Sequence, residues 1–178
     1  GQQVYRSVPA NLRPDLHQLA IRAFSDEDAI VRQNLLKYHQ YIRVALPAST
    51  LVSLLGDPDQ RVQLEALGRV YSNASKRPVV EKIKELSSHP EKGIRLKVVD
   101  VARDSNRYNP AYRGILRAMT KDADPEVTSM AAVELARFGE RIAGDVIERI
   151  KQYLLAARGM SSQVTTILYA VSAMGKDG

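Results

Sequence analysis

Hydrophobic positions along the chain recur at helical spacing behind short polar turns. In residues 121–139, Val127 begins an apolar stripe that continues at the fourth, fifth, eighth and ninth following positions. This spacing is typical of one face of an α-helix. Before the stripe, Asp122 and Asp124 can accept hydrogen bonds from first-turn amides, and Pro125 stands where a helix needs no amide donor. We therefore predict a turn that opens a helix.

The same pattern occurs four times, and we call its first apolar residue the anchor. The anchors are Val31, Val62, Ile94 and Val127. They lie 31, 32 and 33 residues apart, and an acidic residue stands three positions before each of them. These acidic residues are Asp28, Asp59, Glu91 and Asp124. A degenerate fifth copy around Val164 lacks the acid. A nearly constant period over four copies indicates a repeat array.

Prolines divide these copies into pairs of helices. Pro47, Pro78 and Pro110 begin first helices, because proline fits a first turn and breaks a helix interior. We expect Gly139 to end a helix in the left-handed conformation, and no segment has the pattern of a strand. The predicted helices include residues 14–24, 29–44, 47–55, 60–71, 79–87, 111–120, 146–157 and 162–174. The predicted repeats are residues 11–45, 46–75, 76–107, 108–139 and 140–175.

The turns carry a family resemblance. Residues 57–62 and 122–127 resemble the Asp-x-Asp-Pro-x-Val-Arg turn of HEAT repeats common in bacterial and archaeal proteins. The arginine after the anchor is present as Arg32 and Arg95, whereas Gln63 and Thr128 replace it in the other copies, so a continuous Asp–Arg ladder is not expected. The resemblance implies an all-α fold, an α-α superhelix of about five HEAT-like helical hairpins. It implies one repeat domain over residues 1–178, whole or part of a longer protein.

Composition narrows the chemistry. The chain has no cysteine, which excludes disulfides, thiolate metal sites and thiol nucleophiles. It has no run of eighteen apolar residues, so we expect no membrane insertion. The chain begins with Gly in place of Met, which suggests trimming. The compartment is undetermined: we expect a soluble, by default cytoplasmic protein, with export after removal of a signal segment as the alternative.

Candidate catalytic groups are scarce. His17, His39 and His89 fall in different repeats, and none has a second ligand at metal-binding spacing. His89 occupies a turn position where the other copies have aspartate, which favours a helix-capping role. The paired aspartates recur once per repeat and are therefore interpreted as caps. Because phosphate-binding loops and nucleophile motifs are also absent, we expect no enzyme, no cofactor and no metal.

The outward side of the second helices is the candidate binding surface. Projection at 100° per residue from each anchor gives the positions that point away from the core. They are Gln33, Asn34, Lys37, Gln40, Tyr41, Leu64, Glu65, Tyr71, Ser72, Leu96, Lys97, Asp100, Arg103, Asp104, Arg107, Ser129, Met130, Val133, Arg137 and Glu140. In HEAT-like arrays this side is concave. The residues predicted to bind a partner are Asn34, Lys37, Tyr41, Leu64, Glu65, Tyr71, Lys97, Arg103, Arg107, Met130 and Arg137.

Two functions remain open from the sequence. The first is a non-enzymatic scaffold that holds a protein or peptide on this surface, because leucine, methionine, tyrosine and arginine among separated acids are typical of protein interfaces. The alternative is nucleic-acid binding, since the chain has a net charge of +6. Its candidate residues are Lys92, Arg95, Lys97, Arg103, Arg107, Arg113 and Arg117, with Tyr108 and Tyr112 for stacking. A third interpretation is that Leu64, Leu96 and Met130 only cover neighbouring helices.

Overall fold

Helices are the only regular secondary structure in the described part of the chain. The computed structural model describes residues 13–39, 45–107 and 109–156. These residues form nine α-helices and one 3-10 helix, and they contain no strand, so the predicted all-α fold is confirmed. The helices are α2 (Arg13–Ala23), α3 (Ala29–Tyr38), α4 (Ala48–Leu55), α5 (Gln60–Leu67), η3 (Val70–Asn73), α6 (Arg77–Leu86), α7 (Lys92–Ser105), α8 (Ala111–Met119), α9 (Pro125–Arg137) and α10 (Gly144–Ala156).

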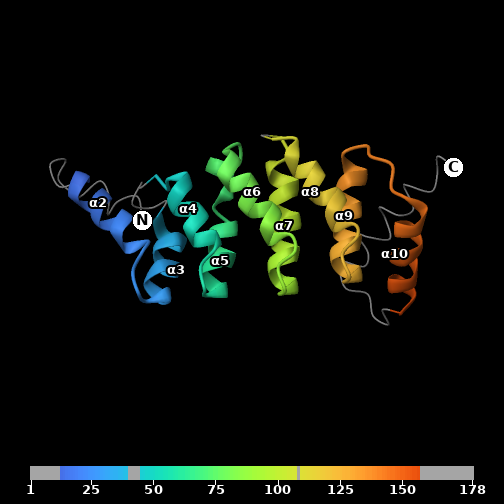
Figure 1. Ribbon diagram of the computed structural model, residues 1–178, viewed down its shortest axis with the longest axis horizontal. Helices are drawn as coiled ribbons and strands as arrows, with labels where there is room; N and C mark the ends of the chain where they lie inside the picture. Colours follow the sequence, from blue (N-terminus) through green and yellow to red (C-terminus); the bar gives the residue numbers. More distant parts are fainter. Residues whose placement is uncertain (1–12, 40–44, 108, 157–178) are drawn as a thin grey trace. The chain divides into compact units, whose positions relative to one another are not determined.

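The chain divides into two compact units, which we describe separately. In unit 1 (Gly1–Ile83), α2 packs against α3, α4 packs against α5, and α3 packs against α5. In unit 2 (Lys84–Gly178), α7 and α8 pack together, and α9 packs against α7, α8 and α10. Within each unit the second helices of successive hairpins thus lie side by side (Figure 1). The superhelix and the single domain concern the whole chain and stay predictions.

Aspartate caps begin three of the second helices, as the sequence predicts. Asp28 accepts a hydrogen bond from the Ile30 amide at 2.8 Å, and Asp59 accepts one from the Arg61 amide at 2.8 Å. Asp124 accepts from the amides of the two residues that follow Pro125. In α7 the equivalent Glu91 makes no side-chain cap. Such caps stabilise a helix by about 1 kcal/mol each because they satisfy first-turn donors.

Three of the four anchors form the centre of the core. Val62, Ile94 and Val127 are 0% exposed. The prediction is wrong for Val31, which is 38% exposed. The other anchors belong to hairpins that follow an earlier repeat, whereas no described residue precedes the hairpin of α2 and α3. Val31 therefore lacks the neighbours that cover the same position elsewhere.

One helix ends earlier than its apolar pattern predicts. α5 stops at Leu67, and a 3-10 helix follows at Val70–Asn73, where the sequence predicts one helix to residue 71. Gly68 lies between the two, and glycine is among the poorest helix formers. The predicted last helix, residues 162–174, and the predicted end of the second helix, residues 40–44, lie outside the described residues.

Gly139 provides a test of the turn after α9. Its φ angle is +76°, which confirms the predicted left-handed cap. Gly139→Ala should lower the free energy of unfolding by about 1 kcal/mol, because a Cβ is strained in this conformation. The matched control is Gly114→Ala inside α8, where an added Cβ meets nothing within 4 Å and should stabilise the helix by about 0.5–1 kcal/mol. Urea denaturation of both variants measures the two changes in the free energy of unfolding, which should have opposite signs. Equal changes would contradict this account.

Tyr112 makes stability depend on alkaline pH. Burial raises the pKa of Tyr112 to about 12, and the nearby Ser105 opposes this rise. The Tyr112 hydroxyl is buried and makes no well-aligned hydrogen bond with a described residue, Ser105 included. The folded protein therefore favours the neutral phenol: its stabilising effect is complete below the ordinary pKa of about 10 and is lost as pH rises toward 12.

We expect unfolding by urea to become easier between pH 10 and 12 by roughly 1–2 kcal/mol through this group. Tyr112→Phe is the control, since it keeps the ring and removes the titrating hydroxyl. The difference between the two proteins isolates Tyr112 from other groups that titrate in this range. A variant that loses as much stability as the parent over this range would contradict the assignment.

Candidate functional site

A buried arginine joins the first two hairpins of unit 1. The guanidinium of Arg32 binds both carboxylate oxygens of Asp57 at 2.7 Å, and this pairing raises the pKa of Arg32. Its third nitrogen donates to the carbonyl oxygens of Asp26 at 2.6 Å and Glu27 at 3.0 Å. One side chain therefore fixes its own turn and the turn of the next repeat.

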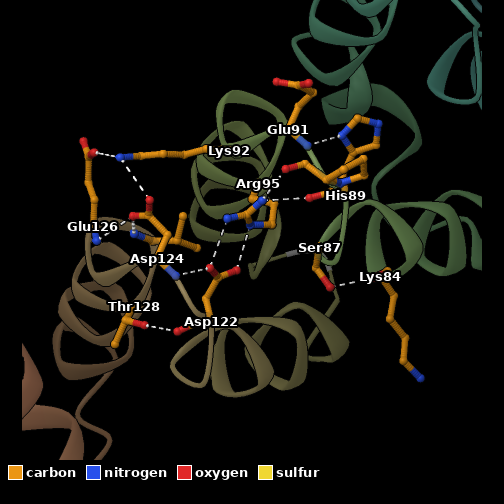
Figure 2. A network of polar contacts seen from close by, with 12 residues as sticks. Lys84, Ser87, His89, Glu91, Lys92, Arg95, Asp122, Asp124, Glu126 and Thr128 are labelled. Carbon is orange, nitrogen blue, oxygen red and sulfur yellow. Dashed lines mark hydrogen bonds and ion pairs between the residues drawn. The ribbon is translucent and has the colours of Figure 1, made fainter.

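Arg95 makes the same connection in unit 2 (Figure 2). It binds the two carboxylate oxygens of Asp122 at 2.8 and 3.2 Å. Its remaining nitrogen donates to the carbonyl oxygens of His89 at 2.8 Å and Pro90 at 2.9 Å. Both arginines that match the HEAT-like motif thus have one structural role, and Arg95 is not available as a free cation.

Thr128 stands in place of this arginine in the fourth repeat, and its shorter side chain contacts only its own turn. Its hydroxyl donates to the Asp122 carbonyl oxygen at 3.0 Å, so it fixes its own turn but reaches no further (Figure 2). Arg149 from α10 donates to the same carbonyl oxygen at 2.7 Å. The other replacement, Gln63, is buried. Among the described residues, therefore, only Arg32 and Arg95 connect the turns of successive repeats in this way.

His89 takes the place of a turn aspartate. In the other turns Asp26, Asp57 and Asp122 accept the amide two residues later at 2.8–2.9 Å. In the third turn the Nδ1 atom of His89 accepts the Glu91 amide at 3.1 Å, as Figure 2 shows. Because Nδ1 accepts, the ring proton is on Nε2. His89 therefore substitutes for the turn aspartate, as predicted, but it caps no first-turn amide of α7.

A cleft of about 370 Å³ lies in unit 2 between residues 87–90 and 118–123. In it, the Ser87 hydroxyl donates to the Lys84 carbonyl oxygen, the His89 Nδ1 atom accepts the Glu91 amide, and Arg95 is bound to Asp122. No three His, Asp or Glu side chains of the described residues gather as a metal site. No helix within the described ranges is long and apolar enough to cross a membrane.

Carboxylates neutralise most of the predicted nucleic-acid-binding residues. Five of these seven residues form ion pairs within 4.0 Å. The pairs are Lys92 with Asp124 and Glu126, Arg95 with Asp122, Lys97 with Asp100, Arg103 with Asp100 and Asp104, and Arg117 with Glu140. Of the other two, Arg113 donates to Asn106 and lies over Phe138, and Arg107 is exposed.

The pairing changes the charge of this region. The sequence shows only Asp100 and Asp104 among the seven cations, but the fold adds acids from α9 and from its flanking turns. Tyr112 is fully buried and cannot stack on a base. Tyr108, the other predicted stacking residue, lies outside the described residues. The nucleic-acid interpretation stays a prediction, and the described charges give it no support.

Unit 2 presents a self-neutralised surface on its second helices. We call Lys97, Asp100, Arg103, Glu134 and Arg137 the α7–α9 surface. The Glu134 side chain lies 2.8 Å from Arg137 and 3.9 Å from Arg103, although Glu134 is only 4% exposed. The sequence analysis missed Glu134. Its position on the helix predicts a buried residue and does not predict its ion pairs with the surface residues Arg103 and Arg137.

Two residues expected to face outward on α9 are buried instead. Ser129 is 0% and Val133 3% exposed, and the Ser129 hydroxyl donates to the Pro125 carbonyl oxygen. The prediction is wrong because α9 has α7, α8 and α10 around it. Projection from one anchor assumes that only one side of a helix is covered.

Unit 1 presents a different surface. We call Ile30, Asn34, Lys37, Leu64 and Tyr71 the α3–α5 surface: the first three share one side of α3 at 100° per residue, Leu64 lies on α5, and Tyr71 lies in η3 shortly after it. All five are exposed, and three are large and apolar or aromatic: Ile30 at 52%, Leu64 at 37% and Tyr71 at 60%. The sequence analysis missed Ile30. A comparison of the repeats could have found it, because the equivalent residues Arg61, Gly93 and Glu126 are not apolar.

The structure separates the predicted partner-binding residues into two groups. Asn34, Lys37, Leu64, Glu65 and Tyr71 belong to unit 1, and all are exposed except Glu65, which is half-buried. In unit 2, Arg107 and Arg137 are exposed, and Lys97, Arg103 and Met130 are half-buried. Tyr41 lies outside the described residues.

Comparisons with known proteins leave the family open: no family model and no curated protein matches this chain. The HEAT-like resemblance of the turns therefore stays a prediction.

Proposed function

We propose that this chain is a non-enzymatic scaffold that binds a partner protein or peptide through the α3–α5 surface. The observation that supports this is the exposure of Ile30 on α3, Leu64 on α5 and Tyr71 in η3, where α3 and α5 pack against each other. Neighbouring exposed apolar side chains mark interaction sites, and tyrosine is enriched among residues that dominate binding energy. Burial of these three side chains by a partner would supply the driving force.

The α7–α9 surface contributes less in this proposal. Most of its charges are paired within the surface, although the buried Oε2 atom of Glu134 has no hydrogen-bond partner among the described residues, so a partner would mainly replace existing ion pairs with new ones. Such exchanges between exposed pairs yield little net energy, typically about 0–1 kcal/mol. We therefore place the energetic centre of binding in unit 1.

Selection from a random displayed peptide library on the whole chain tests this function. Recovered peptides should bind the parent protein and lose affinity by roughly tenfold or more with Leu64→Ala and Tyr71→Ala combined, since hot-spot side chains contribute over about 1 kcal/mol each. Leu155→Ala is the matched control, because Leu155 on α10 is a more exposed leucine in unit 2.

The control variant should bind the peptides as the parent does. Peptides that bind equally well to all three proteins, or that lose binding only with Leu155→Ala, would contradict the proposed surface. Thermal unfolding of each variant confirms that the fold is retained before binding is compared.

A further inference from the structure

The charges of unit 1 are separated along its second helices. In Figure 1 the turns that precede α3 and α5 lie at the lower edge of this unit, and both helices run upward from them. We call the group around these turns the turn edge. It comprises Asp26, Glu27, Asp28, Asp57 and Asp59 with Arg32 and Arg61, five carboxylates and two arginines, for a net charge of −3.

The opposite ends of these helices carry cations, which we call the basic edge. It comprises Lys37, Arg69, Lys76 and Arg77. Arg69 donates to the carbonyl oxygens of Leu36 and Lys37 at the end of α3, so the cations from different helices share one edge. The Lys76 amide donates to the Asn73 carbonyl oxygen at the end of η3, so the beginning of α6 follows directly after the short helix that has Arg69 as its N-cap residue.

The basic edge is poorly neutralised. Arg69 lies 3.6 Å from Glu65, and no described carboxylate pairs with Lys37, Lys76 or Arg77. The parts of unit 1 outside the described residues, 1–12 and 40–44, contain no Asp or Glu in the sequence. Residues of the turn edge, by contrast, have structural tasks as caps and as the partner of Arg32.

Helix formation does not explain two of these cations. Lys76 and Arg77 stand at the N-terminus of α6, whose first turn has no acidic residue. A helix N-terminus has a partial positive charge, so cations are unfavourable there. Tyr38 adjoins one of the cations: the Lys37 ammonium lies 5.6 Å from its ring centre.

We propose that the partner segment is a peptide with acidic residues at one end and apolar residues beside them. Its apolar side chains would cover Ile30 and Leu64, and its carboxylates would reach Lys37, Lys76 and Arg77. This inference rests on the proposed function and adds the chemical class and the orientation of the partner. Complementary charge at one end and like charge at the turn edge would fix one direction of binding.

A peptide fits these observations better than a nucleic acid does. A phosphate backbone that follows the second helices would meet the carboxylates of the turn edge, whereas a peptide can be acidic at one end only. Nucleic-acid binding at this edge is therefore one of the outcomes that the experiment must distinguish.

The same peptide library tests this inference with the whole chain. Peptides selected on the parent protein should carry a net negative charge, and synthetic copies with every acid replaced by lysine should bind at least roughly tenfold more weakly. Lys76→Glu combined with Arg77→Glu should weaken the original peptides by roughly tenfold, since each reversal replaces an attraction with a repulsion. Lys121→Glu combined with Arg141→Glu is the charge-matched control on exposed residues of unit 2, and it should have no effect.

Each other outcome overturns the inference. The role of the basic edge would be contradicted if the selected peptides were neutral or basic. It would also be contradicted if acidic peptides bound the Lys76/Arg77 variant and the control variant equally. In both cases a loss of binding with Leu64→Ala and Tyr71→Ala would still uphold the proposed function. Recovery of no Leu64-dependent peptide would contradict both. An oligothymidylate that displaces the peptides and whose affinity falls steeply between about 50 and 200 mM salt would assign the edge to nucleic acid instead.

Discussion

Arg95→Met should lower the free energy of unfolding by about 3 kcal/mol, the loss typical of a buried ion pair that loses one partner. The side chains of Arg95 and Asp122 are only 13% and 9% exposed. Methionine fills a similar volume but leaves the Asp122 carboxylate without its cation. It also removes the donor from the carbonyl oxygens of His89 and Pro90. Urea denaturation, which leaves ion pairs unscreened, measures the loss.

Arg117→Met is the control for this prediction. Arg117 also makes a bidentate contact, with Glu140 at 2.7 and 2.8 Å, but its side chain is 60% exposed. Exposed pairs contribute about 0–1 kcal/mol, so this variant should be nearly as stable as the parent. If the two variants lost equal stability, burial would not be what makes the Arg–Asp connection strong.

The second large effect is expected at an anchor. Val127→Ala should lower the free energy of unfolding by about 2 kcal/mol, because two buried methyl groups are lost and a cavity remains. Val31→Ala removes the same atoms from the same position of the first repeat, yet Val31 is partly exposed. Its loss should be about 1 kcal/mol or less.

A pair of equal losses would contradict this account of the anchors. Equal losses of about 2 kcal/mol would mean that Val31 is as well covered as the other anchors. Equal small losses would mean that Val127 is not part of a tightly packed core. Measurement of both variants under one condition makes the comparison independent of the absolute stability.

Local patterns predicted the helices well because their causes are local. The aspartate caps, the prolines at first turns and the positive φ of Gly139 each depend on a few neighbouring residues. The end of α5 was predicted too late because the apolar pattern continues past Gly68, while the backbone does not. The burial of Val62 and Val127 followed from periodicity for the same reason.

The candidate sites were less predictable because they depend on contacts between repeats. The cations of residues 92–117 form a basic cluster in the sequence, but Asp122, Asp124, Glu126 and Glu140 neutralise many of them in space. Lys76 and Arg77 drew no attention because their sequence neighbourhood is ordinary. In the fold no described carboxylate forms an ion pair with either of them, not even Glu81 one turn further along α6, and no linear charge count shows this.

Two features of unit 1 point to the same place. The α3–α5 surface and the basic edge have Lys37 in common, and Tyr71 of the first lies two residues after Arg69 of the second. Unit 2 has neither feature in its α7–α9 surface, where opposite charges pair within the surface itself. The proposed scaffold therefore has one binding unit whose chemistry differs from that of its neighbour in sequence.

Backbone amide NMR of the whole isotope-labelled chain, titrated with a library-selected peptide, tests the central claim most directly. The account predicts that resonances of α3, α5 and η3 change, with Leu64 and Tyr71 among the largest changes, while those of α7 and α9 stay in place. Changes confined to α7 and α9 would show that the partner binds the other surface and would contradict the account.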